Sequence, residues 1–165
     1  MSEVERISDQ LRRSHQGSAW HGPSLLEVLD GVTDEQANRR VLPNAHTIWE
    51  LVLHLTAWEQ VVTRRLAGET VPDLPPDQDF PAVADATGDG WKSALDQMNQ
   101  AQRQLAQSIA QLTDDGLKRM VAGKDYSVYF MLHGAIQHKL YHAGQIAVFK
   151  KSLAPPTPAP DRSAT

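Results

Sequence analysis

The strongest constraint on the fold is an apolar repeat of three and four residues that runs through long parts of the chain. Between residues 46 and 67 one stripe of apolar side chains follows this spacing: Ile48, Leu51, Val52, Leu55, Trp58, Val62 and Leu66. Such a repeat places its members on one face of an α-helix. No convincing alternation with a period of two, which would indicate a strand, is present. The sequence therefore predicts an all-α protein.

We expect four long helices and two short ones. The spacing predicts the long helices over about residues 3–16, 46–67, 89–112 and 127–152. Ser127 is the expected N-cap of the last, and Gly68 is expected to end the second. Ser24 can cap a short helix, and Thr33 with Gln36 has the pattern of a capping box before another. These elements predict a four-helix bundle.

The connection between the second and third long helices is unusually long. Residues 69–90 contain four prolines and several acids, and the usual helix–helix link is only a handful of residues. These two helices therefore need not be antiparallel neighbours. Residues 154–165 are rich in proline and too polar to bury much surface, so we predict a disordered tail there. We expect one domain over residues 1–153.

The composition restricts the functional classes. The chain has 165 residues, a net charge of -4 and no cysteine. Disulfides, thiolate metal ligands and a cysteine nucleophile are therefore excluded. No basic cluster indicates a nucleic-acid partner. No run of about 18 apolar residues predicts a membrane span, and no apolar signal segment is present. We expect a cytoplasmic protein that acts on a small molecule.

Two histidines four residues apart lie in the last predicted helix. His138 and His142 are about 40° apart around the axis and about 6 Å apart along it, so both side chains can reach one ion. The same spacing holds zinc in helical zinc motifs. Two ligands rarely make a site, however, and a third is expected from a facing helix.

His54 is the best candidate for the third ligand. It lies in the middle of the second long helix, at the edge of the apolar stripe. His133 faces another direction and His46 lies at the helix start, so neither is expected to bind the ion. His15 and His21 remain open. Taken singly, a histidine at such an edge is more often a hydrogen-bonded core residue than a ligand, and only the combination of three indicates metal.

Three further residues have candidate roles around this site. Glu50 precedes His54 by one turn and can accept the N–H of His54 or act as a catalytic base; the alternative is an exposed helix glutamate. Gln145 can hydrogen-bond a ligand or support packing. Lys139 projects among the apolar residues of its helix, and a buried lysine beside a dication is costly. We expect it to reach the rim or line the mouth of a cavity.

Two segments resemble the DinB/YfiT-like superfamily. They are "HTIWELVLHLTAWEQVVTRRLAGE", which contains His54, and "HGAIQHKLYHAGQIAVFKK", which contains an H-x-x-x-H-x-G-Q pattern from His138 to Gln145. "AWHGPSLLEVLDGVT" resembles the early part of that family. The resemblance implies a four-helix bundle, three histidines on one divalent ion (usually nickel or zinc) and frequent homodimers. It also implies chemistry such as that of thiol-dependent isomerases and thiol S-transferases.

Three neutral imidazoles leave a dication with its full charge and with room for water or substrate, as in catalytic zinc sites. Such a set suits zinc, nickel or iron. The expected function is activation of a thiol or water for attack on a small electrophile. Without cysteine, the thiol would be a separate molecule of low molecular weight. The alternatives are a metal-dependent hydrolase and a metal- or ligand-binding bundle without turnover.

Overall fold

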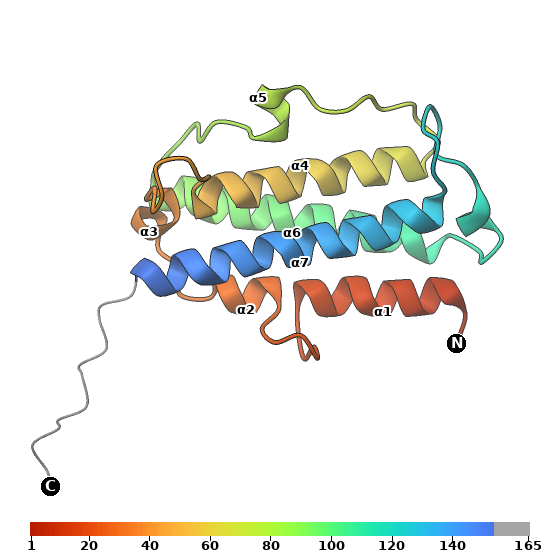
Figure 1. Cartoon of the computed structure of the whole chain (residues 1–165), viewed down its shortest axis with the longest axis horizontal. Coiled ribbons are helices and arrows are strands. Elements are labelled where there is room, and N and C mark those ends of the chain that lie inside the picture. The colour runs from red at the N-terminus through yellow and green to blue at the C-terminus, as the bar shows by residue number, and fades with distance from the viewer. Residues whose placement is uncertain (154–165) are drawn as a thin grey trace, which may run out of the picture.

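The computed structural model describes residues 1–153, and every regular element in this range is helical (Figure 1). The helices are α1 (Glu3–His15), α2 (Leu25–Leu29), α3 (Asp34–Asn38), α4 (Ile48–Leu66), α5 (Pro76–Asp79), α6 (Gly88–Ala110), the 3₁₀ helix η1 (Gly116–Lys118) and α7 (Val128–Leu153). The only β-type pairing within residues 1–153 is a single bridge between Met120 and Ser127. The all-α prediction is confirmed. The predicted tail, residues 154–165, lies outside the described residues.

The predicted start and stop signals lie where the helices begin and end. The Thr33 side chain accepts a hydrogen bond from the backbone N–H of Gln36, which forms the capping box of α3. Ser127 accepts from the N–H of Phe130 at the start of α7. Gly68 follows α4 with φ of 92°, a conformation that only glycine adopts without strain. Capping residues thus set the boundaries of these helices.

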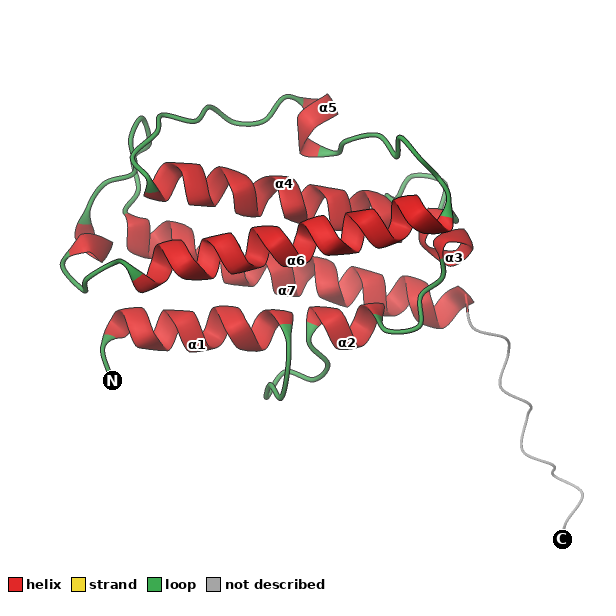
Figure 2. Ribbon diagram, turned by 180° about the vertical axis from the view of Figure 1, so that it is seen from behind, coloured by secondary structure: helices red, strands yellow, loops and turns green. Residues whose placement is uncertain are grey.

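Helices α1, α4, α6 and α7 lie along one another (Figures 1 and 2). Helix α4 packs against α6 and α7, and α1 packs against the same two helices. Helices α1 and α2 follow each other end to end along one side. Because α4 and α7 are in contact, side chains from the middle of each can converge on one site.

The apolar core is divided into two clusters along the long axis. One cluster includes Leu55, Met98 and Ala143, and the other includes Val62, Leu105 and Ile136. Between them, α4, α6 and α7 each contribute a buried polar residue: Glu59, Gln102 and Lys139. The middle of the molecule is therefore a polar layer between two apolar ones.

The long connection from α4 to α6 contains a short helix that the sequence interpretation did not include. Helix α5 begins at Pro76, a residue suited to the first turn because its missing N–H would have no partner there. Figure 1 shows α5 above α4, on the side away from α1. The connection thus crosses the outside of α4 and returns at the start of α6.

Candidate metal centre

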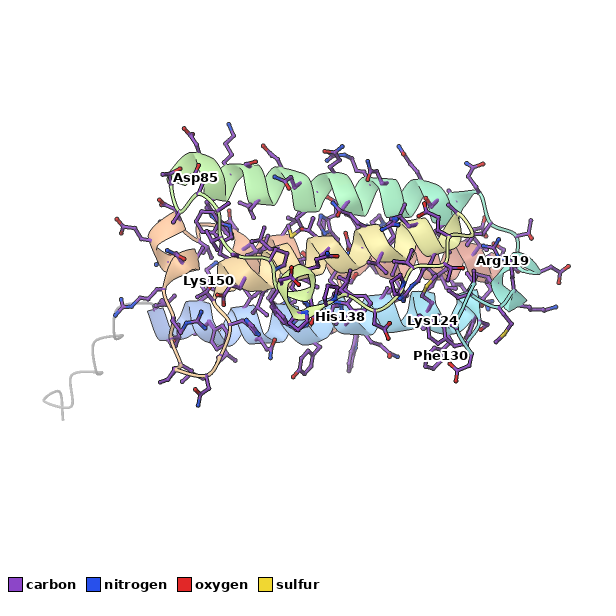
Figure 3. The ribbon with its side chains drawn as sticks, turned by 90° about the horizontal axis from the view of Figure 1, so that it is seen from above. Asp85, Arg119, Lys124, Phe130, His138 and Lys150 are labelled. Carbon is purple, nitrogen blue, oxygen red and sulfur yellow. The ribbon has the colours of Figure 1, made fainter. Side chains whose placement is uncertain are left out.

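The structure brings together the three histidines that the sequence singles out. His54 is on α4, and His138 and His142 are one turn apart on α7. Nε2 of His138 lies 2.9 Å from Nε2 of His54 and 3.0 Å from Nε2 of His142. The three possible ligand atoms all lie within 4.8 Å of one another. His138 is labelled in Figure 3, near the middle of α7.

The outer nitrogens of two rings determine which tautomer is present. Nδ1 of His54 lies 2.7 Å from the backbone carbonyl oxygen of Asp79, which can only accept, so Nδ1 carries the proton. Nδ1 of His142 lies 2.6 Å from Oε1 of Gln145 and donates in the same way. In each neutral ring Nε2 is then unprotonated. These lone pairs point toward Nε2 of His138.

Burial keeps the three imidazoles neutral. It is the main cause that lowers the pKa of His138 to about 4, and the neighbouring His142 and His54 contribute in the same direction. Burial is also the main cause that lowers the pKa of His54 and of His142, although hydrogen bonds to Asp79 and Gln145 oppose it. Neutral imidazole is the form that binds metal.

A divalent ion fits this donor set. Nitrogen ligands at about 2.0–2.1 Å around a tetrahedral ion are about 3.3 Å apart, close to the 2.9 and 3.0 Å between the Nε2 atoms. The unprotonated Nε2 atoms of His54 and His142 both face Nε2 of His138. A proton or a cation must lie between such lone pairs, and one proton on Nε2 of His138 can form a hydrogen bond to only one of the two. The three histidines are therefore suited to hold a metal ion.

The connection between α4 and α6 encloses His54. The Phe80 ring stacks on His54 with centroids 4.1 Å apart and on His46 with centroids 3.5 Å apart. The Asp79 carboxylate lies 3.1 Å from Nδ1 of His54 and accepts a hydrogen bond of 2.7 Å from Nε1 of Trp58. Asp79 thus orients the His54 ring from outside the cluster, as carboxylates commonly do for ligating histidines.

A cavity of about 390 Å³ adjoins the cluster. His54 and His138 form part of its wall, and most of the remaining wall is apolar, with Trp58, Phe130 and Met131 among the larger side chains. A small organic molecule fits a space of this size and character.

Glu50 does not have the position expected beside His54. One oxygen of its carboxylate binds Arg40 at 2.7 Å, and the other accepts the N–H of Thr47 at 2.8 Å, which caps α4. His46 lies 3.3 Å from the same second oxygen. Glu50 does not accept the N–H of His54, one of the roles considered for it, because the backbone oxygen and carboxylate of Asp79 lie at Nδ1 of His54. The catalytic role of Glu50 stays a prediction, although Glu50 does not line the cavity.

The expectation that Lys139 reaches the rim is also wrong. Its side chain is fully buried and lies 2.5 Å from Oε1 of Glu59, so the cost of burying the ammonium is offset by an opposite charge. Lys139 does line the cavity, from within. Gln145 has the first of its two candidate roles, since it accepts a hydrogen bond from His142.

The four remaining histidines lie outside the cluster. His133 is partly exposed near Glu3, and His46 is partly exposed against Phe80. Of the two left open by the sequence, His15 is buried with Nε2 2.9 Å from Asn99, and His21 lines a separate surface pocket. None of the four shares an ion-sized space with His54, His138 and His142 in the described part of the chain.

Fold and site together define an all-helical protein in which three clustered histidines are suited to a metal ion. The chain matches the family model of the DinB superfamily over residues 19–146, most of its length, and it belongs to that superfamily. The resemblance seen in the sequence is thus confirmed. Comparison with curated proteins and with solved structures gave no match. Among residues 1–153, no helix has the length and hydropathy needed to cross a membrane.

Two features of the site escaped the sequence interpretation. Asp79 and Phe80 belong to the Pro-rich connection, and nothing in the local pattern ties that segment to His54. The second feature, the pairing of Glu59 with Lys139, is indicated by the sequence pattern. Glu59 shares its helical stripe with Leu55 and Val62, and Lys139 lies on the apolar stripe of its own helix. Opposite charges on two apolar stripes indicate a buried ion pair.

Proposed function

We propose that this protein binds one divalent ion through His54, His138 and His142 and acts on a small molecule in the adjoining cavity. Zinc or nickel is the ion that the chemistry and family suggest, since a set of neutral imidazoles suits both. The observation that carries the proposal is the convergence of three Nε2 atoms beside a largely apolar cavity whose wall includes His54 and His138.

The proposed reaction is transfer of a thiol to a small electrophile. His54, His138 and His142 would hold a divalent ion whose Lewis acidity would lower the pKa of a thiol or water toward neutrality. The sulfur forms a bond to the electrophilic carbon, the bond from that carbon to its leaving group breaks with its electron pair going to that group, and the thiol proton passes to the leaving group or to solvent. Because the chain has no cysteine, the thiol must be a separate molecule.

The protein's own residues prepare the site for this chemistry. Asp79 and Gln145 hold two of the imidazoles in the tautomer that directs Nε2 inward. Trp58 and Phe80 exclude water from one side of His54. Exclusion of water strengthens electrostatic interactions with charge that develops during reaction.

The metal is tested first, on protein purified without a nickel column. Elemental analysis is expected to find about one divalent ion per chain, and none in a His138→Ala, His142→Ala double variant. The matched control is His133→Ala, on the same helix but outside the cluster, which should retain the ion. Retention of metal by the double variant would overturn the ligand assignment.

The reaction is tested by substituting cobalt as a spectroscopic reporter. Addition of a low-molecular-weight thiol is expected to produce a sulfur-to-cobalt charge-transfer band, followed by turnover when an electrophile is added. A spectrum unchanged by thiols, together with ester hydrolysis, would favour the hydrolase instead. An unchanged spectrum without turnover of either kind would favour a binding protein.

We also propose the architecture and assembly that the family suggests. In this proposal α1, α4, α6 and α7 are the helices of a DinB-type four-helix bundle, and the α4–α6 connection is its long crossover. The contacts of α4 and of α1 with both α6 and α7 support this arrangement. The chain is proposed to form a homodimer, which the exposed apolar side chains on α7 support.

A further inference from the structure

An ion pair lies in the wall of the cavity that adjoins the three histidines. Nζ of Lys139 lies 2.5 Å from Oε1 of Glu59, and the two side chains are only 2% and 7% exposed. Both residues line the cavity together with His54 and His138. Figure 3 shows this region between α4 and α7, around the labelled His138. The pair sits in the polar layer between the two apolar clusters.

The carboxylate of Glu59 is short of hydrogen bonds. Nζ of Lys139 forms an ion pair with Oε1 of Glu59 and donates its hydrogen bond to the side-chain oxygen of Gln102. Both carboxylate oxygens of Glu59 are buried without a hydrogen-bond partner within residues 1–153, and Oε2 also has no cation against it. Burying an acceptor without a partner costs about 1–3 kcal/mol, and more when the group is charged. An unpaired acceptor in a cavity wall is therefore a place where a ligand can gain affinity.

The surroundings restrict the kind of group that fits Oε2. A cationic donor would be repelled by Lys139, which lies against the same carboxylate. An anion would face Glu59 itself. A neutral hydroxyl or amide N–H can donate to Oε2 without either penalty. The rest of the ligand is expected to be largely apolar, because most of the wall is apolar, including Leu55, Val62 and Met131, although Arg65, Asp79 and Tyr126 also line the cavity.

We propose that Glu59, held by Lys139, binds a neutral hydrogen-bond donor on a largely apolar substrate in this cavity. A molecule anchored there extends toward His54 and His138 in the same cavity, so Glu59 determines which part of it faces the three histidines. As an assignment of substrate class, the inference rests on the proposed function. Donor binding itself requires no metal, so the two can be tested apart.

The test uses two probes, 3-phenyl-1-propanol, which has a hydroxyl donor, and its methyl ether, in which a methyl group replaces the hydroxyl hydrogen. Their binding is measured by calorimetry and by tryptophan fluorescence, to which Trp58 in the cavity wall contributes. Each titration is made with metal-loaded protein and with protein stripped by a chelator. We expect the alcohol to bind at least about tenfold more tightly than the ether in both forms, because a hydrogen bond to a charged group is among the stronger ones.

A double variant identifies the acceptor. Removing one partner of a buried ion pair leaves the other charge unpaired and can unfold the protein, whereas replacing both with apolar residues is often neutral. In Glu59→Leu, Lys139→Met we expect the alcohol and the ether to bind within about twofold of each other. Circular dichroism and metal analysis check that this variant keeps its fold and its ion.

Each outcome decides the proposal. Equal affinities in the unaltered protein, or no binding of either probe, would overturn it. A preference for the alcohol that persists in the double variant would place the donor elsewhere and also overturn it. Loss of the preference in the double variant supports it, whether or not the metal is present. Failure of the metal or thiol experiments alone would count against the proposed function and leave the donor site standing.

Discussion

His15 shows how a single buried residue couples the stability of this fold to pH. It is the last residue of α1, and Nε2 lies 2.9 Å from the side-chain oxygen of Asn99 on α6. Burial is the main cause that lowers the pKa of His15 from 6.5 to about 4, and the charge of Lys139 acts in the same direction. Between about pH 6.5 and about pH 4 the unfolded chain therefore binds more protons than the folded one. The stabilisation from neutral His15 is present above this range and is lost as the pH falls through it.

We predict that this loss can be measured by substitution. Between about pH 7 and about pH 4.5, the free energy of unfolding of the unaltered protein should fall by about 2 kcal/mol more than that of His15→Gln. Urea unfolding with chelator present measures both, and the other histidines contribute equally to the two proteins. Parallel pH profiles would show that His15 is not the titrating group.

At this scale the sequence was informative about the ligands and about Gln145 as a partner of His142, but it did not identify the partner of His54. The spacing of His138 and His142 and the mid-helix position of His54 follow from helical periodicity, which one sequence contains. The partner of His54 depends on where a long connection folds back, and that is decided by packing between segments distant in the chain. Glu50 was considered as a partner of His54 from its angular position alone, but its carboxylate instead forms the capping box at the start of α4.

At the scale of elements, the connection between α4 and α6 is the part least determined by periodicity and most important for the site. Its short helix α5 ends at Asp79, and Phe80 follows. Asp79 holds the imidazole of His54 by its backbone oxygen and its carboxylate, while Phe80 covers the ring. The connection therefore positions a candidate ligand as well as joining two helices.

We predict that Asp79→Ala weakens zinc binding about tenfold. The carboxylate beside His54 and its hydrogen bond from Trp58 are lost, but the backbone oxygen stays, so the effect should lie at the low end of the usual range of about 10–100-fold. The matched control is Glu50→Gln, which keeps the capping pattern and should leave zinc affinity within about twofold. Competition with a chelating dye measures both affinities.

The reverse order of zinc affinities would contradict the role of Asp79 in positioning His54. If Glu50→Gln weakened zinc binding more than Asp79→Ala, the sequence-based role of Glu50 would regain support, and the contact between Asp79 and His54 would be incidental. Melting temperatures of the two variants separate a local effect on the ion from a general loss of stability.

At the scale of the whole molecule, the outer face of α7 is unusual for a surface helix. Between Asp125 and Lys150 the only charged residue is Lys139, and that side chain is buried. Phe130, Tyr141 and Val148 are 65%, 65% and 64% exposed on this helix. A helix that is apolar on all sides is normally covered on all sides. The sequence predicts the helix itself, but an exposed apolar face becomes visible only once its neighbours are placed.

We predict that two copies of the chain associate through this face of α7. A patch shared by both copies is what a two-fold dimer requires. Light scattering at tens of micromolar should give twice the monomer mass, and Tyr141→Glu with Val148→Glu should give the monomer because two charges would then be buried at the contact. Gln107→Glu, which adds a charge to the exposed side of α6, should leave the dimer intact.

Phe130 lies both on α7 and in the cavity wall, so a second copy packed against α7 would also border the cavity. A monomer in the unaltered protein at these concentrations would show that the face of α7 is not a contact between copies.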